Sequence, residues 1–175
     1  MTHRVSWWLR LPLIVVAGGV IAATAGVRVN WTPSLPVGFY LVTPFRGTPD
    51  RGVIVRACLP SDVAPMAQAR GYVGTGWCEG GTMPLLKPAA ALPGDIVTVD
   101  EGAGVLVNGA PVVPPAQTRD SHGRPLTPLP AGTYPVKPGM VWLLSAHTPA
   151  SFDSRYFGAV PVALIDATAQ PLLTY

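Results

Sequence analysis

Short apolar runs, broken by glycine or proline, make up the chain from Val29 onward. The 175 residues include 19 glycines and 21 prolines, and proline interrupts both helices and interior strands because it lacks a backbone donor. Short apolar runs between such breaks are typical of strands. The pattern therefore predicts an all-β domain, in a chain long enough for one domain with a real core.

Asn108-Gly109 gives the strongest local signal, because this dipeptide between two apolar runs predicts a two-residue hairpin turn. A short helix is expected over 61–71, with Ser61 as its cap, Pro65 in its first turn and Gly71 as its stop. The proline-rich segment 114–138 is expected to be an exposed loop. The expected strands cover residues 39–42, 52–57, 96–99, 105–107, 110–113, 140–144 (buried on both faces) and 159–165.

An uncharged apolar segment runs from Leu11 to Val27. Its length is at the lower limit for a helix that crosses a bilayer, and Trp7-Trp8 suit the headgroup layer. The alternative is a signal peptide cleaved within residues 22–26. We favour the anchor and predict a transmembrane helix in residues 1–28, followed by a periplasmic catalytic domain over 29–175.

The charge pattern supports this division. The first 28 residues hold Arg4, Arg10 and Arg28 and no acidic residue, so the net charge of +3 originates there. Two arginines before the apolar segment and one after it place the N-terminus in the cytoplasm and the domain outside it. We therefore expect a single-pass protein of the bacterial inner membrane. The remainder is neutral and has no basic aromatic patch, which argues against nucleic-acid binding.

Two cysteines, Cys58 and Cys78, lie in the exported part. An even count in an oxidising compartment favours one disulfide, which would close the 58–78 excursion between strands. Two unpaired buried thiols are the alternative. No cysteine or histidine spacing indicates a metal site.

Lys87 is the single charged residue between Pro84 and Leu92. Either its strand lies at the surface and the ammonium reaches water, or the amine is buried, its pKa falls from ~10.4 toward ~7–8, and it becomes a general base. Ser34, between Pro33 and Pro36, is held in a stiff turn that suits a nucleophile, although most such serines are only turn residues.

Three segments together resemble the type I signal peptidase family, whose members use a Ser-Lys dyad. Ser34-Leu35-Pro36 matches its nucleophile motif, and Lys87 precedes Pro93-Gly94-Asp95 at the family's spacing. Ser151 to Gly158 matches Ser-x-Asp-Ser-Arg-x-x-Gly at every specified position. The order and specificity of these motifs imply an all-β, signal-peptidase-like catalytic domain.

The match is closer to the conjugative-transfer branch called TraF. Its pattern Asn-x-Thr-x-Ser-x-Pro-x-Gly-x-Tyr fits Asn30 to Tyr40, and paired cysteines precede Pro-Leu-Leu-Lys. Members of this branch mature the pilin of a conjugation system, and some join its ends into a ring. One departure from the wider family is visible: residues 145–150 replace a Gly-Asp-Asn run.

The resemblance implies roles for individual residues. Ser34 is the nucleophile, Lys87 the base, and Ser151 orients the lysine amine. The Ser34 amide and the Thr32 hydroxyl form the oxyanion hole. Two further residues of the third motif, Asp153 and Arg155, form a supporting ion pair, although Asp153 is sometimes given a catalytic part in this branch.

The implied partners are a membrane-inserted pilin precursor, inner-membrane lipid and the secretion machinery of conjugation; no cofactor or metal is implied. A general signal peptidase and a non-catalytic assembly factor are alternative functions. A Ser34-His147-Asp153 triad is an alternative mechanism, and Asp153-Ser154-Arg155 taken alone would indicate an exposed ion pair. Nothing in the sequence decides between cleavage and ring closure.

Overall fold

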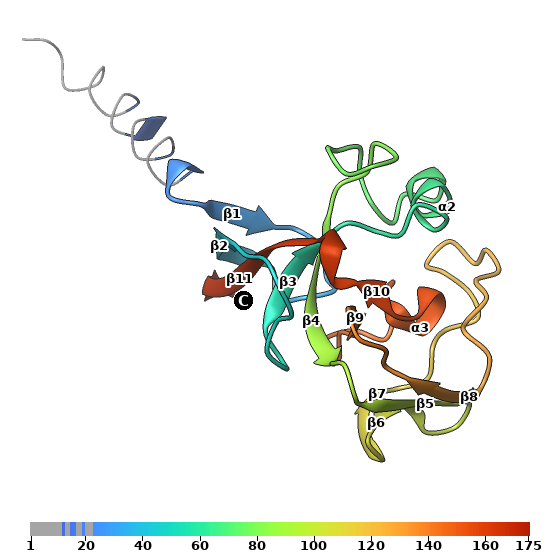
Figure 1. Ribbon diagram of the computed structural model, residues 1–175. Coiled ribbons are helices and arrows are strands. Elements are labelled where there is room, and N and C mark those ends of the chain that lie inside the picture. The colour runs from blue at the N-terminus through green and yellow to red at the C-terminus, as the bar shows by residue number, and fades with distance from the viewer. Residues whose placement is uncertain (1–11, 13–14, 17–18, 20–22) are drawn as a thin grey trace, which may run out of the picture.

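The protein is shown in Figure 1 as a computed structural model, which describes residues 12, 15–16, 19 and 23–175. Most of the predicted anchor, with Trp7-Trp8, lies outside the described residues. Among those that are described, no helix has the length and apolar character needed to span a bilayer.

Eleven strands form the described domain. Their bounds are β1 Val27–Asn30, β2 Gly38–Pro44, β3 Ile54–Ala57, β4 Leu85–Ala91, β5 Ile96–Asp100, β6 Gly104–Val107, β7 Ala110–Val113, β8 Gly132–Pro135, β9 Met140–Leu143, β10 Val160–Pro161 and β11 Ile165–Thr174. The helical elements are α2 Ala64–Ala69, α3 Ser154–Phe157 and the 3-10 turn η1 Val162–Leu164. The prediction of a mainly β domain is confirmed.

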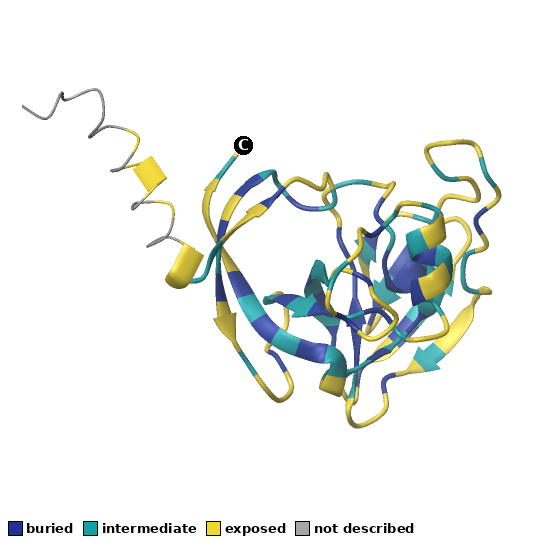
Figure 2. Ribbon diagram, turned by 90° about the horizontal axis from the view of Figure 1, so that it is seen from above, coloured by how far each residue is buried: buried dark blue, intermediate teal, exposed yellow. Residues whose placement is uncertain are grey.

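Two sheets organise these strands (Figure 1). The larger has the order β1-β2-β11-β3-β4-β9-β10 and the smaller the order β7-β6-β5-β8. Buried residues of the larger sheet belong to separate apolar clusters. One cluster contains Val55, Ala89 and Leu143, and another contains Tyr40 and Val42. Figure 2 shows that many of the buried residues lie in the strands. Strand β4 pairs with β3 on one side and β9 on the other, so Lys87 lies on an interior strand.

The predicted hairpin is confirmed. Strands β6 and β7 are antiparallel with Val107 opposite Ala110. Asn108 and Gly109 have φ values of 51° and 80°, the two positive angles that a type I′ turn requires. The Asn108 side chain also accepts a hydrogen bond from the Ile96 amide at 2.9 Å, which ties the turn to β5.

Three local predictions were wrong in part. The strand expected over 159–165 is divided, because β10 pairs with β9 whereas β11 lies between β2 and β3, and η1 makes the turn between these positions. Strand β8 lies inside the segment expected to be a loop. Helix α2 begins after Val63, not at Ser61, and has no side-chain cap.

The Cys58–Cys78 disulfide is present, with the two Cα atoms 5.7 Å apart. It closes the excursion that contains α2. A small apolar cluster fills the excursion, made of Leu59, Ala64, Ala67 and Val73. This prediction is confirmed, and the alternative of two unpaired thiols was wrong.

Candidate active site

Lys87 is buried, with 3% of its surface exposed, and lies opposite Val55 in β3. Burial lowers the pKa of its amine to about 8; the carboxylate of Asp153 opposes this shift and the charge of Arg155 adds to it. Within the described residues the amine has no hydrogen-bond or ion-pair partner. The surface reading of this lysine was wrong, because only 3% of the residue is exposed.

Ser145 follows strand β9, which pairs with the strand of Lys87. The pairing of Ala89 with Leu143 and the bond from the Leu144 amide to the Pro88 carbonyl at 3.1 Å set the register of β4 and β9. The chain neighbours of Lys87 and Ser145, Pro88 and Leu144, are therefore joined by a backbone hydrogen bond.

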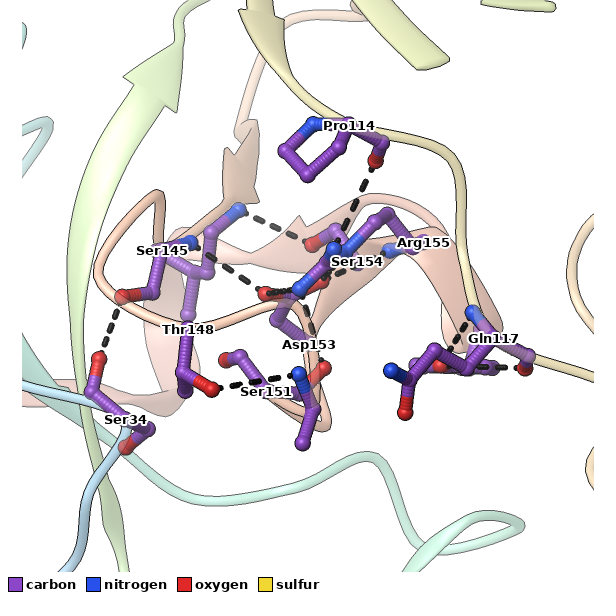
Figure 3. A network of polar contacts seen from close by, with 12 residues as sticks. Ser34, Pro114, Gln117, Ser145, Thr148, Ser151, Asp153, Ser154 and Arg155 are labelled. Carbon is purple, nitrogen blue, oxygen red and sulfur yellow. Dashed lines mark hydrogen bonds and ion pairs between the residues drawn. The ribbon is translucent and has the colours of Figure 1, made fainter. Parts of the chain in front are cut away.

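Ser34 is half-buried, and it is bonded to Ser145, just after the end of β9. The Ser145 hydroxyl donates a hydrogen bond to the Ser34 carbonyl (Figure 3). Ser145 therefore contacts the residue predicted as nucleophile. No hydrogen bond joins Lys87 Nζ directly to Ser34 Oγ, a contact that often tightens only when substrate binds.

The Asn30 side chain shapes the loop that carries Ser34. Its amide group donates to the carbonyls of Thr32, Leu35 and Pro36 at 3.0, 3.3 and 3.2 Å. Its Oδ1 accepts from the Thr32 amide at 3.2 Å and from the Thr32 hydroxyl at 2.7 Å. The buried side chain of Asn30 thus bonds to four backbone groups of this turn.

Thr32 Oγ1 lies 3.3 Å from Ser34 Oγ. A hydroxyl has one proton to donate, and the Thr32 proton is directed to Asn30, so Ser34 is the donor in this contact. Thr32 is therefore close enough to act beside Ser34, the residue predicted as nucleophile. To donate to an oxyanion it would have to release Asn30.

The third motif forms a buried network beside Ser145 (Figure 3). Arg155 contacts Asp153 through Nε and Nη2, both at 2.9 Å. The ion pair is 1% and 0% exposed, so the expectation of an exposed pair was wrong. Asp153 also accepts from the Ser145 amide at 3.2 Å. The Ser151 hydroxyl is buried and has no hydrogen-bond partner among the described residues, which leaves it free to contact an amine.

His147 does not complete a Ser-His-Asp triad in this structure. It is exposed, and its backbone amide, rather than its ring, reaches Ser145 Oγ at 3.4 Å. The Asp153 carboxylate is engaged by Arg155 and holds no histidine ring. The described residues also lack any cluster of three or more His, Cys, Asp or Glu side chains suited to a metal ion.

A comparison with protein families shows to which family the chain belongs. The model described as "Signal peptidase, peptidase S26" matches residues 4–173. The chain belongs to the signal peptidase family. Membership implies a peptidase, and the predicted resemblance is confirmed.

Curated relatives of this signal peptidase family member carry the name TraF. The "Probable conjugal transfer protein TraF" of Sinorhizobium fredii is 39% identical over 167 residues, covering 93% of this chain and 86% of that protein. The "Plasmid transfer protein TraF" of Escherichia coli is 36% identical over 166 residues, covering 93% and 89%. The crystal structure of a signal peptidase I from Enterococcus faecalis aligns with a TM-score of 0.40 and 21% identity, covering 71% of this chain and 98% of that one.

Sequence reasoning missed two residues of this site. Asn30 was used only as the start of a pattern, although a polar residue two positions before Thr32 could have indicated a turn-forming side chain. Ser145 was noted only within a departure from the family motif. No local signal identifies it, because its contact with Ser34 joins residues 111 positions apart.

Proposed function

We propose that the chain is a membrane-anchored serine endopeptidase that processes the pilin precursor of a conjugation system, with Ser34 as nucleophile and Lys87 as base. The observation that carries the proposal is the buried amine of Lys87, whose pKa is about 8. A substantial fraction of such an amine is neutral near physiological pH, so it can accept the hydroxyl proton of a serine. Arginine in its place could not, because guanidinium does not lose its proton in proteins.

The reaction follows from these roles. Ser34 Oγ attacks the scissile carbonyl while its proton passes to Lys87, and the Ser34 amide with the Thr32 hydroxyl stabilises the oxyanion. Lys87 then returns the proton to the leaving amine, which departs and leaves an acyl-enzyme. Water attacking this ester gives cleavage; the substrate's own amino terminus attacking it gives a ring.

Three residues of the third motif, Ser151, Asp153 and Arg155, support the dyad. The free hydroxyl of Ser151 is available to orient the lysine amine. Asp153 is already engaged by donors from Arg155 and Ser145, which favours a structural role over a second proton-transfer role. The pair therefore fixes the loop beside the dyad.

The place of action is the periplasmic face of the inner membrane. Val29 of β1 and Leu173 of β11 both pair with Phe39 of β2, and all three are exposed. Trp31, two residues after Val29, is 76% exposed. Such an apolar patch suits contact with lipid, the setting in which a membrane-inserted precursor presents its cleavage site. The conjugal transfer and plasmid transfer names of the relatives support a role in conjugation, and a pilin precursor is the substrate that we propose within it.

The test is the intact mass of a pilin precursor coexpressed with the full chain. We expect processing with the wild type, none with Ser34→Ala or Lys87→Arg, and nearly full processing with His147→Ala. Turnover by the arginine variant would exclude lysine as the base. Processing that survives Ser34→Ala would favour the non-catalytic assembly factor.

A second substrate separates pilin processing from general signal peptide removal. An unrelated exported precursor should remain uncut when the pilin precursor is processed, and equal cleavage of both would favour the general peptidase. In the same spectra, a product lighter than the linear form by one water identifies ring closure.

A further inference from the structure

We propose that Ser145 is a positioning residue for the nucleophile, fixing the main chain of Ser34 against β9. The inference rests on the proposed function, because it concerns the geometry of the same dyad. It assigns Ser145 no proton transfer and no contact with substrate.

The first support is the hydrogen bond itself. Ser145 is 1% exposed, and its hydroxyl donates to the Ser34 carbonyl. Because the hydroxyl has one proton, this contact uses its whole donor capacity. Holding the Ser34 carbonyl restricts rotation about ψ of Ser34, and so restricts where Ser34 Oγ can lie.

The second support is what holds Ser145. Its amide donates to Asp153 Oδ2 at 3.2 Å, and Asp153 is fixed by Arg155. The residue before it, Leu144, donates its amide to the carbonyl of Pro88, the residue after Lys87. One buried residue thus bonds to both the nucleophile turn and the ion pair of the third motif, directly after a backbone bond to the strand of the base.

Another buried serine offers a matched control. Ser154 is 0% exposed and its Oγ accepts from the Leu143 amide at 2.9 Å, so it also bonds to β9. Its hydroxyl makes no contact with Ser34 or Lys87. Removing either hydroxyl deletes one buried hydrogen bond to the same region, but only Ser145→Ala releases the nucleophile turn.

The experiment measures kcat, KM and unfolding midpoint for the full chain in detergent, using a peptide that spans the cleavage site. Small displacements of a nucleophile are costly, and about 1 Å can reduce rate about 100-fold. We expect Ser145→Ala to lower kcat about 10- to 100-fold with KM within about twofold. Ser154→Ala should lose a similar amount of stability with kcat within about threefold. Ser145→Thr, which keeps the hydroxyl, should recover most of kcat.

The pH profile separates positioning of Ser34 from an effect on Lys87. The acid limb of kcat/KM should stay at the wild-type pH in Ser145→Ala, because burial sets the lysine pKa. A shifted limb, or a kcat loss no greater than that of Ser154→Ala, would overturn the proposal. An inactive wild type would instead count against the proposed function.

Discussion

At the scale of the residue, the candidate site depends on the buried amine of Lys87, whose charged form is unfavourable away from water. Burial lowers the pKa of Lys87 from 10.5 to about 8, which means that the folded protein binds this proton less tightly than the unfolded chain does. Between pH 8 and 10.5 the unfolded state holds more protons, so stability rises with pH across that window. Below pH 8 the full cost of roughly 3 kcal/mol is present.

Lys87→Met should therefore stabilise the protein at pH 7 by about 2–3 kcal/mol while abolishing activity. Urea unfolding at several pH values measures the difference between variant and wild type. This difference should shrink as pH rises from 8 to 10.5. Lys137→Met, at the exposed lysine, is the control and should change little at any pH. A gain that does not vary with pH would show that packing, not charge burial, is responsible.

A second residue-scale prediction concerns Asn30. Asn30→Asp keeps the shape and the Oδ1 acceptor but places a carboxylate oxygen against three carbonyls. The turn should loosen, with kcat falling at least about tenfold and stability falling by about 2 kcal/mol. Peptide cleavage and urea unfolding check both effects.

The same chemical change at Asn108 serves as the comparison. Asn108 Nδ2 donates to Asp95 at 2.8 Å in the β6–β7 hairpin, so Asn108→Asp also turns a donor into an acceptor beside an acceptor. It should cost stability but leave kcat close to wild type. Equal losses of kcat in both variants would mean that Asn30 acts only through overall stability.

Sequence alone could predict those parts of the candidate site that residue types and their spacing in the chain indicate. Ser34 and Lys87 stand in motifs, but whether Lys87 is buried depends on β3 and β9, which pair with β4 from distant parts of the chain. Ser145 could not be found, because a serine after an apolar strand has no signature until the fold brings it to Ser34.

At the scale of the element, the same limit applies. The hairpin around Asn108-Gly109 was predictable because its turn chemistry is local. Strand β11 was missed because its alternating positions hold small alanines, because Gln170 and Pro171 interrupt it, and because it is stabilised by pairing with β2 and β3. Non-local pairing, which single-sequence patterns do not encode, decided its place.

The disulfide-closed excursion gives an element-scale prediction. Tyr72 of the excursion donates to Asp120 at 2.7 Å and packs on Phe152 with ring centroids 4.9 Å apart, so the excursion supports the loop of the third motif. Replacing Cys58 and Cys78 together by serine should lower unfolding free energy by about 3 kcal/mol. Urea unfolding of the wild type with reductant should match the variant. A variant as stable as the oxidised wild type would contradict this.

At the scale of the whole molecule, strands β1, β2 and β11 lie at one end and the smaller sheet at the other (Figure 1). The exposed apolar patch on these three strands comprises the paired residues Val29, Phe39 and Leu173, and the exposed apolar residues Trp31, Leu172 and Tyr175 are close to them in the chain. Strand ends beside the C-terminus are accordingly coloured as exposed in Figure 2. Ser34 follows Trp31 closely in the chain, so a membrane surface against this patch would place the nucleophile near the lipid.

The corresponding prediction compares two substrates for the full chain reconstituted in vesicles. Phe39→Ser with Leu173→Ser removes two neighbouring apolar side chains from the patch. This should reduce kcat/KM for a membrane-inserted precursor by at least about tenfold, since full burial of even one such side chain contributes about 1.5–3 kcal/mol. Cleavage of a short soluble peptide should stay within about twofold, because the dyad is untouched. Ile96→Ser, an exposed apolar residue of the smaller sheet, should affect neither substrate. Equal losses for both substrates would show that the patch stabilises the domain itself and does not orient it on lipid.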